Sequence, residues 1–203
     1  MLDAPPDTEP SAAPAPKRRI APWIALGVAV VVVALFVLLA GSPTKSTDNV
    51  TNFAVGKPAP AVVSTTFDGQ PFDLSRRKGS WVVLNFFNTT CLPCKAEHPE
   101  LVQFAQQQGS LGVDGAELYT ITWGGDNQSD VRTWFTDNGG NWPIVDDPNG
   151  KIAVSLGVAQ VPETWIVDPQ GIIVQRIPNQ ITASALSQTV QRWREVESGV
   201  PTT

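Results

Sequence analysis

A Cys-x-x-Cys motif constrains this chain more than any other feature of its sequence. Cys91 and Cys94 closely follow the continuous apolar run from Trp81 to Phe87, which predicts a strand buried on both faces. We expect a helix from Cys91 to about Gln108, so that both cysteines lie where a buried strand gives way to a helix. This arrangement predicts an α/β domain with two cysteines at the amino end of a helix.

The position of the two cysteines favours redox chemistry. Free backbone amides and the positive end of the helix dipole stabilise a thiolate at the first cysteine, which makes Cys91 the expected nucleophile. Cys94, one turn further along the helix, is the expected resolving thiol that releases a mixed disulfide. A purely structural disulfide is the alternative, but a bond that closes so small a loop stabilises a fold less than one closing a long loop.

Metal binding is a second alternative for the same segment. Cys91, Cys94 and His98, the single histidine of the chain, fall on one face of the predicted helix and are ligand types that bind copper or zinc. The sequence holds no further cysteine or histidine to complete a tetrahedral site. We therefore expect no metal, and we interpret His98 as a solvated surface residue.

An apolar run near the amino terminus predicts a membrane anchor. No charged residue lies between Ile20 and Ala40, and a helix of that length spans the ~30 Å hydrocarbon layer of a bilayer. A cleaved signal peptide would have a shorter apolar core, of ~7 to 15 residues, and a small-x-small cleavage site. Lys17, Arg18 and Arg19 precede the run, so the positive-inside rule places the amino terminus in the cytoplasm and everything after the run outside it.

Composition divides the rest of the chain. Residues 1–19 are rich in proline and predict a disordered cytoplasmic tail, residues 20–40 form the expected transmembrane helix, and residues 41–54 are a polar linker. Residues 55–200 form the expected folded domain. The formal net charge of -5 provides no basic surface for phosphates, so we exclude nucleic acid as a partner.

The folded part alternates strand and helix patterns before it ends in a hairpin and a helix. The turn sequence from Phe67 to Gln70 predicts an early hairpin, and the one from Asp168 to Gly171 predicts a second hairpin. Further expected strands cover residues 118–123, 144–145, 163–167 and 172–176, and further helices lie around residues 131–135, 152–156 and 182–197. Together these elements predict a mixed central sheet with helices on both faces.

Two separated motifs occur here in the order found in one known family. The first runs from Val83 through both cysteines to Pro99, and the second comprises Leu156-Gly157-Val158 and the segment from Val161 to Gly171. They resemble the membrane-anchored thioredoxin-like proteins of the TlpA, ResA and CcmG (DsbE) group, and the resemblance extends over residues 55–197. It implies a thioredoxin-like fold with an extra amino-terminal hairpin and a central βα insertion.

The resemblance also implies roles for individual residues. Pro162 matches the family's cis-proline, which faces the two cysteines, and the backbone of Val161 matches the strand edge that pairs with substrate. Glu97 and Glu163 match two acidic positions near the active site of this group. Taken alone, either glutamate would be interpreted as a solvated charge, and Glu97 more readily than Glu163.

Two positions depart from related proteins. Asn85 stands where thioredoxin has a buried aspartate that assists proton transfer, so acid and base chemistry is assigned to Glu163 and Glu97. Thr90 stands directly before Cys91, where most of the family has tryptophan. An aromatic platform for the partner is therefore missing, which affects substrate preference and leaves the thiol chemistry intact.

These residues predict an extracytoplasmic thiol-disulfide oxidoreductase. Leu92 and Pro93 offer the thiolate no side-chain donor, so we expect a reducing Cys91/Cys94 pair. The resemblance implies apocytochrome c or its maturation partners as disulfide substrates, and a transmembrane thiol transporter of the CcdA or DsbD type as electron donor. No cofactor is expected, because the sequence carries no haem motif, nucleotide loop or dinucleotide fingerprint.

Three other functions compete with this prediction. The first is a general extracytoplasmic disulfide reductase or oxidase without a cytochrome c role. The second is a thiol peroxidase, which would need Thr or Ser three residues before the reactive cysteine, where this chain has Asn88. The third, a copper-delivery protein, would need a Cys-x-x-x-Cys motif and a distant histidine, and neither is present.

Overall fold

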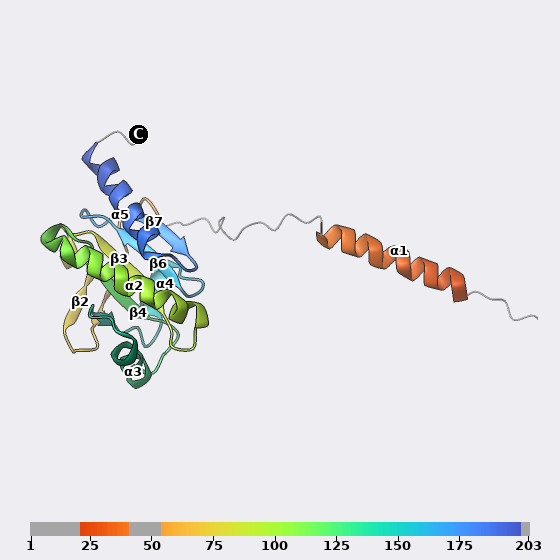
Figure 1. Cartoon of the computed structure of the whole chain (residues 1–203), viewed down its shortest axis with the longest axis horizontal. Helices are drawn as coiled ribbons and strands as arrows, with labels where there is room; N and C mark the ends of the chain where they lie inside the picture. The colour runs from red at the N-terminus through yellow and green to blue at the C-terminus, as the bar shows by residue number, and fades with distance from the viewer. Residues whose placement is uncertain (1–20, 41–53, 200–203) are drawn as a thin grey trace, which may run out of the picture. The chain divides into compact units, whose positions relative to one another are not determined.

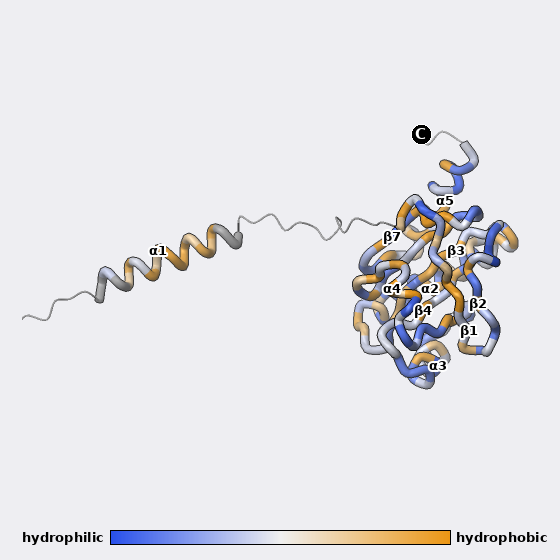
Figure 2. Tube along the Cα trace, turned by 180° about the vertical axis from the view of Figure 1, so that it is seen from behind, coloured by the Kyte–Doolittle hydropathy of each residue, from blue (hydrophilic) through white to orange (hydrophobic). Residues whose placement is uncertain are grey.

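The computed structural model describes residues 21–40 and 54–199 (Figure 1). The predicted tail, residues 1–19, and most of the predicted linker lie outside these described residues. Helix α1 (Ala21–Ala40) and residues 54–199 belong to two different compact units, and Figure 2 shows apolar residues along α1. None of the helices, as far as their residues are described, reaches the length and apolarity needed to cross a membrane. The transmembrane helix therefore stays a prediction.

The folded domain is built on a five-stranded mixed sheet with the order β5-β4-β3-β6-β7. Strand β3 pairs in parallel with β4, which pairs in parallel with β5, whereas β6 is antiparallel to both β3 and β7. The strands are β3 (Val82–Phe87), β4 (Glu117–Thr122), β5 (Ile144–Val145), β6 (Glu163–Val167) and β7 (Ile173–Pro178). The mixed sheet predicted from the sequence is confirmed.

Strand β3 occupies the centre of the sheet because all of its residues except Asn85 are apolar, on both faces. All six of its residues are buried, which is the pattern of a strand covered on both sides. Its carboxyl end leads directly into the cysteine motif. Because β6 is antiparallel to β3, with Phe86 opposite Glu163, the amino end of β6 lies beside that carboxyl end. The segment before β6, which contains Pro162, is thereby brought next to the cysteines.

Helices cover both faces of the sheet, as predicted. On one face, apolar side chains of α2, α3 and α5 pack in one cluster with Val83 and Phe87. On the other face, α4 packs in a second cluster with Leu84 and Phe86. The helices that cover the sheet are α2 (Leu92–Ser110), α3 (Gln128–Asn138), α4 (Lys151–Leu156) and α5 (Ala183–Ser198), and the short 3-10 helices η2 (Leu74–Arg77) and η3 (Gly112–Asp114) lie in the same domain. We call the first the cysteine face of the sheet, because Cys94 belongs to its cluster.

An amino-terminal hairpin precedes the sheet, which confirms the hairpin expected at residues 67–70. Strands β1 (Val63–Thr65) and β2 (Pro71–Asp73) are antiparallel. The same segment bridges both outer strands of the main sheet, because Pro58 pairs with Ile172 beside β7 and Thr66 pairs with Val145 in β5. Between these two bridges, Val62 is fully buried in the cluster opposite the cysteine face.

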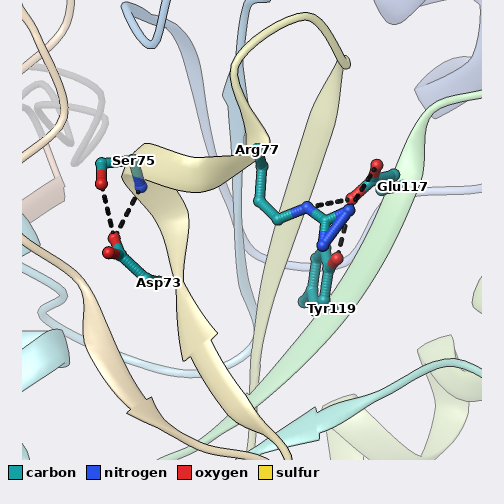
Figure 3. A network of polar contacts seen from close by, with 5 residues as sticks. All are labelled: Asp73, Ser75, Arg77, Glu117 and Tyr119. Carbon is teal, nitrogen blue, oxygen red and sulfur yellow. Dashed lines mark hydrogen bonds and ion pairs between the residues drawn. The ribbon is translucent and has the colours of Figure 1, made fainter.

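A polar network lies at the end of the sheet where β3 and β4 begin, remote from the cysteines (Figure 3). Asp73 accepts hydrogen bonds from the backbone nitrogen and the hydroxyl of Ser75, at 2.9 and 2.7 Å. Arg77 forms an ion pair with Glu117 at 3.0 Å, and the hydroxyl of Tyr119 donates to the same carboxylate at 2.7 Å. Burial and the adjacent carboxylate raise the pKa of Tyr119. Since Glu117 begins β4, this network holds the end of the sheet remote from the cysteines.

Candidate active site

The two cysteines form a disulfide at the amino end of α2. Their sulfur atoms are 2.12 Å apart and their Cα atoms 5.3 Å apart. Cys91 is the N-cap residue of α2, with extended backbone angles, and the backbone nitrogen of Cys94 donates a hydrogen bond to its Sγ at 3.1 Å. Pro93 fits in the first turn because its missing amide hydrogen would have no partner within the helix there. Cys91 is partly exposed and Cys94 is buried, which is the order of access that a nucleophile and a resolving thiol require.

The proline loop lies against the exposed cysteine. The Val161–Pro162 peptide bond is cis, as the resemblance implies, and Pro162 is buried. The carbonyl oxygen of Val161 lies 3.6 Å from Sγ of Cys91. Leu92, between the cysteines, is 76% exposed and flanks the same position. The structure thus brings together the cysteines and the two substrate-binding residues predicted from the sequence.

Glu97 is buried beneath the cysteines, and its interpretation as a solvated charge is wrong. Its side chain is only 2% exposed, because it lies on the stripe of α2 that packs against the sheet. Its carboxylate accepts hydrogen bonds from Nδ2 of Asn85 at 3.0 Å and from the backbone nitrogen of Ile181 at 2.9 Å. Burial raises the pKa of Glu97 from 4.5 to about 7, and the two hydrogen bonds limit the rise. A carboxyl group that titrates near neutral pH can exchange protons during thiol chemistry.

Asn85 connects Glu97 to the neighbouring strand. Its Nδ2 also donates to Oγ1 of Thr164 at 3.1 Å, so β3, β6 and α2 contribute to one buried polar group. Ile181 adds the loop before α5, and Nε2 of Gln180 in that loop donates to the carbonyl oxygen of Pro93 at 3.0 Å. Sequence reasoning missed the contributions of Thr164, Gln180 and Ile181. The available signal was Asn85, a polar residue in an otherwise apolar strand.

Glu163 lies on the other face of the sheet. It stands opposite Phe86 and one residue before Thr164, so its side chain points away from the cysteine face. Its carboxylate forms an ion pair with Arg176 at 2.6 Å and accepts a hydrogen bond from Nε1 of Trp165 at 2.7 Å. The structure thus brings Glu97, but not the carboxylate of Glu163, to the face that holds the cysteines. An acid or base role for Glu163 stays a prediction.

His98 is also buried, so its interpretation as a solvated surface residue is wrong. It is 1% exposed and packs among aromatic rings that α3 and its flanking residues supply, because it lies on the apolar stripe of α2. Its Nε2 lies 2.8 Å from the carbonyl oxygen of Gly139, and burial lowers its pKa. Within the described ranges, no group of three histidine, cysteine or acidic side chains is arranged to hold a metal ion.

The segment before Cys91 is held by a second polar group. Thr89 donates its backbone nitrogen and its hydroxyl to the carboxylate of Asp126, at 2.6 and 2.5 Å. Asn88 accepts from the backbone nitrogen and the hydroxyl of Thr90, at 2.8 and 2.5 Å. Thr90 itself is exposed where an aromatic residue was noted as missing. The loop that presents Cys91 is therefore ordered by hydrogen bonds rather than by an aromatic ring.

Comparisons with known proteins agree with this geometry. Residues 55–176 match the AhpC/TSA family. Thiol:disulfide interchange protein HelX of Rhodobacter capsulatus is 32% identical over 138 residues, which cover 66% of this chain and 74% of HelX. Thiol-disulfide oxidoreductase ResA of Bacillus subtilis is 30% identical over 131 residues, which cover 64% of this chain and 71% of ResA. The crystal structure of StoA from Bacillus subtilis superimposes with a TM-score of 0.57 at 26% identity, over 66% of this chain and 99% of StoA.

Proposed function

Because the chain belongs to the AhpC/TSA family of thioredoxin-like proteins and is a thiol-disulfide oxidoreductase, we propose that it acts outside the cytoplasm and reduces disulfides of apocytochrome c or its maturation partners. The observation that carries the thiol chemistry is the Cys91–Cys94 disulfide at the start of α2, with the Val161–Pro162 peptide bond against it. The resemblance to the TlpA, ResA and CcmG group supports the choice of substrate.

The first step is attack by the reduced protein on a substrate disulfide. The thiolate of Cys91 forms a bond to one substrate sulfur, and the substrate's own sulfur–sulfur bond breaks. The second substrate sulfur leaves as a thiolate and takes a proton from solvent. The backbone of Val161, whose carbonyl oxygen lies 3.6 Å from Sγ of Cys91, is where an extended substrate segment would align, next to the sulfur that attacks it.

The second step releases the substrate. Cys94 loses its proton, its sulfur attacks the mixed disulfide at Cys91, and the substrate departs with both of its sulfurs reduced. The two electrons gained by the substrate come from the Cys91/Cys94 pair, which ends as the disulfide seen here. Glu97, one turn along α2 from Cys94 and with a pKa near 7, is the buried group placed to accept the Cys94 proton.

The direction of electron flow follows from how weakly the thiolate is stabilised. The segment between the cysteines provides the thiolate with few hydrogen-bond donors. The side chain of Leu92 is apolar, and Pro93 has neither a polar side chain nor a backbone amide hydrogen. The reduction potential should therefore lie nearer to thioredoxin at ~ -270 mV than to the oxidant DsbA at ~ -120 mV. Equilibration with a dithiothreitol or glutathione series measures it, and a value above ~ -180 mV would contradict a reducing function.

A protein that reduces disulfides outside the cytoplasm must itself be reduced again, by electrons that come from the cytoplasm. We propose that residues 20–40 anchor the protein in the membrane, beside a transmembrane thiol transporter of the CcdA or DsbD type. The charge-free run from Ile20 to Ala40 and the basic residues before it support this arrangement. Alkaline extraction of membranes tests it: the full chain should stay with the membrane, and a chain lacking residues 1–40 should not.

Haem staining of c-type cytochromes in a deletion strain tests the choice of substrate. We expect the mature cytochromes to be lost, restored by the wild-type chain, and not restored by Cys91→Ala. Addition of a small thiol to the medium should restore part of the signal, because it replaces the missing electrons. Normal cytochromes in the deletion strain, together with accumulated disulfides in other exported proteins, would favour a general disulfide reductase instead.

A further inference from the structure

Three backbone amides immediately before the first helical turn have acceptors within the protein. The amide of Thr89 donates to Asp126 at 2.6 Å, that of Thr90 to Oδ1 of Asn88 at 2.8 Å, and that of Cys91 to the carbonyl oxygen of Asn88 at 3.1 Å. The donor that the structure places on Sγ of Cys91 is the amide of Cys94. These hydrogen bonds hold the loop that presents Cys91, and the three amides donate to Asp126 and Asn88 rather than to the sulfur of Cys91.

Asp126 joins this loop to the one between β4 and α3. Besides the amide of Thr89, it accepts the hydroxyl of the same residue at 2.5 Å. A second link between the two loops is the hydrogen bond that Nδ2 of Asn88 donates to the carbonyl oxygen of Trp123 at 2.7 Å. Asp126 is partly buried, and no ion pair involving it occurs among the residues the structure describes. Its negative charge is therefore not neutralised by a basic side chain there, and partial burial extends the range over which it acts.

We infer that Asp126 is a positioning residue for the thiol chemistry, which fixes the loop that presents Cys91 and opposes the formation of a thiolate on it. A like charge near an ionisable group disfavours its charged form. Asp126 would in this way help to keep the dithiol reducing, in addition to the absence of donors at Leu92 and Pro93. The inference rests on the thiol chemistry alone and does not depend on the substrate being a cytochrome.

The pH dependence of Cys91 alkylation in the reduced, full-length protein tests this role. Asp126→Asn keeps the size of the side chain and removes its charge. We expect the midpoint of iodoacetamide reaction at Cys91, located by mass spectrometry, to move to lower pH by about half a unit, which is the order of effect that one nearby charge has on a partly exposed thiol. At a pH below that midpoint, this corresponds to an alkylation rate raised about threefold, because the thiolate fraction changes tenfold per pH unit.

Matched variants separate charge from structure. Asp126→Glu keeps the charge and Thr89→Val removes one hydrogen bond but leaves the carboxylate, so both should keep the wild-type midpoint. Asp130→Asn removes an exposed charge from the first turn of α3 and should also leave the midpoint unchanged. If Asp126→Asn does not fold, Asp126→Ser keeps a hydrogen-bonding side chain without the charge and should lower the midpoint by the same amount. An unchanged midpoint in Asp126→Asn, or an equal shift in Asp130→Asn, would overturn the inference.

Discussion

Replacement of Glu97 by glutamine should remove a large part of the pH dependence of stability. The wild-type carboxyl has a pKa raised from 4.5 to about 7, because burial disfavours its charged form. The native state therefore holds this proton more tightly than the unfolded chain does. The resulting stabilisation is fully present below pH 4.5 and is lost as the pH rises through 7. At ~1.4 kcal/mol per pKa unit, the loss amounts to about 3 to 4 kcal/mol.

Urea denaturation of the oxidised protein at several pH values between about 4 and 8 measures this loss. The quantity to compare is the difference in free energy of unfolding between the wild-type protein and Glu97→Gln at each pH. Other groups that titrate in this range, His98 included, occur in both proteins and cancel in the difference. We expect the difference to shift by about 3 to 4 kcal/mol in favour of the variant as the pH rises.

An exposed carboxylate on the last helix serves as the control. Glu197→Gln removes one acidic group from α5 without altering a buried contact, and its difference from the wild-type protein should be constant across the range. A difference between wild type and Glu97→Gln that also stays constant, to within about 1 kcal/mol, would refute the assignment of a neutral-range pKa to the buried carboxyl.

Three further predictions concern the cysteines, the buried ion pair and the histidine. Cys94→Ala should trap partners as mixed disulfides on diagonal gels, whereas Cys91→Ala should not, and equal trapping would reverse the assignment of the nucleophile. Arg176→Met should lower the free energy of unfolding by about 3 to 5 kcal/mol in urea titrations, because the buried carboxylate of Glu163 would lose its ion-pair partner. Acid should destabilise the wild-type protein below pH 6.5 more than His98→Phe, because burial lowers the pKa of His98 and the unfolded chain takes up the proton first. Parallel acid profiles for these two proteins would contradict that reasoning.

Local sequence patterns were sufficient to predict most of the fold. The apolar run before the cysteines was predicted to be a buried strand and forms β3, and the turn residues from Asp168 to Gly171 join β6 and β7 as expected. The cysteine motif and Pro162 were predicted as neighbours because the resemblance supplied a contact that local patterns do not contain. Their adjacency depends on β6 running antiparallel to β3, which is a property of the whole sheet.

The acidic and basic residues around the site were harder to predict because their burial depends on distant elements. Glu97 is covered by the loop before α5, and His98 by α3 and the residues after it. A signal was nevertheless present, since both residues share a helical stripe with Cys94, Leu101 and Phe104, all of which are buried. The sequence interpretation gave more weight to the polarity of Glu97 and His98 than to their position on the helix. The structure shows that the helical position predicts their burial better. The side chain of Glu163 points away from the cysteine face because successive residues of a strand point to opposite faces of the sheet. The family motif gives the position of Glu163 in the sequence but not the face of the sheet on which it lies.

The amino-terminal segment that bridges β7 at Pro58 and β5 at Thr66 has a consequence for solubility. An open sheet has two outer strands whose free backbone groups can recruit a strand from another molecule. Here one stretch of chain covers both outer strands: Gly56 donates to Ile173 in β7, Ala59 donates to Gly171 in the turn before β7, and Phe67 donates to Ile144 in β5. A shortened protein that began after Asp73 would keep both cysteines and the proline loop, yet it would present two uncapped edges. We expect such a fragment to self-associate through its sheet, so the segment from Gly56 to Phe67 protects the domain against aggregation.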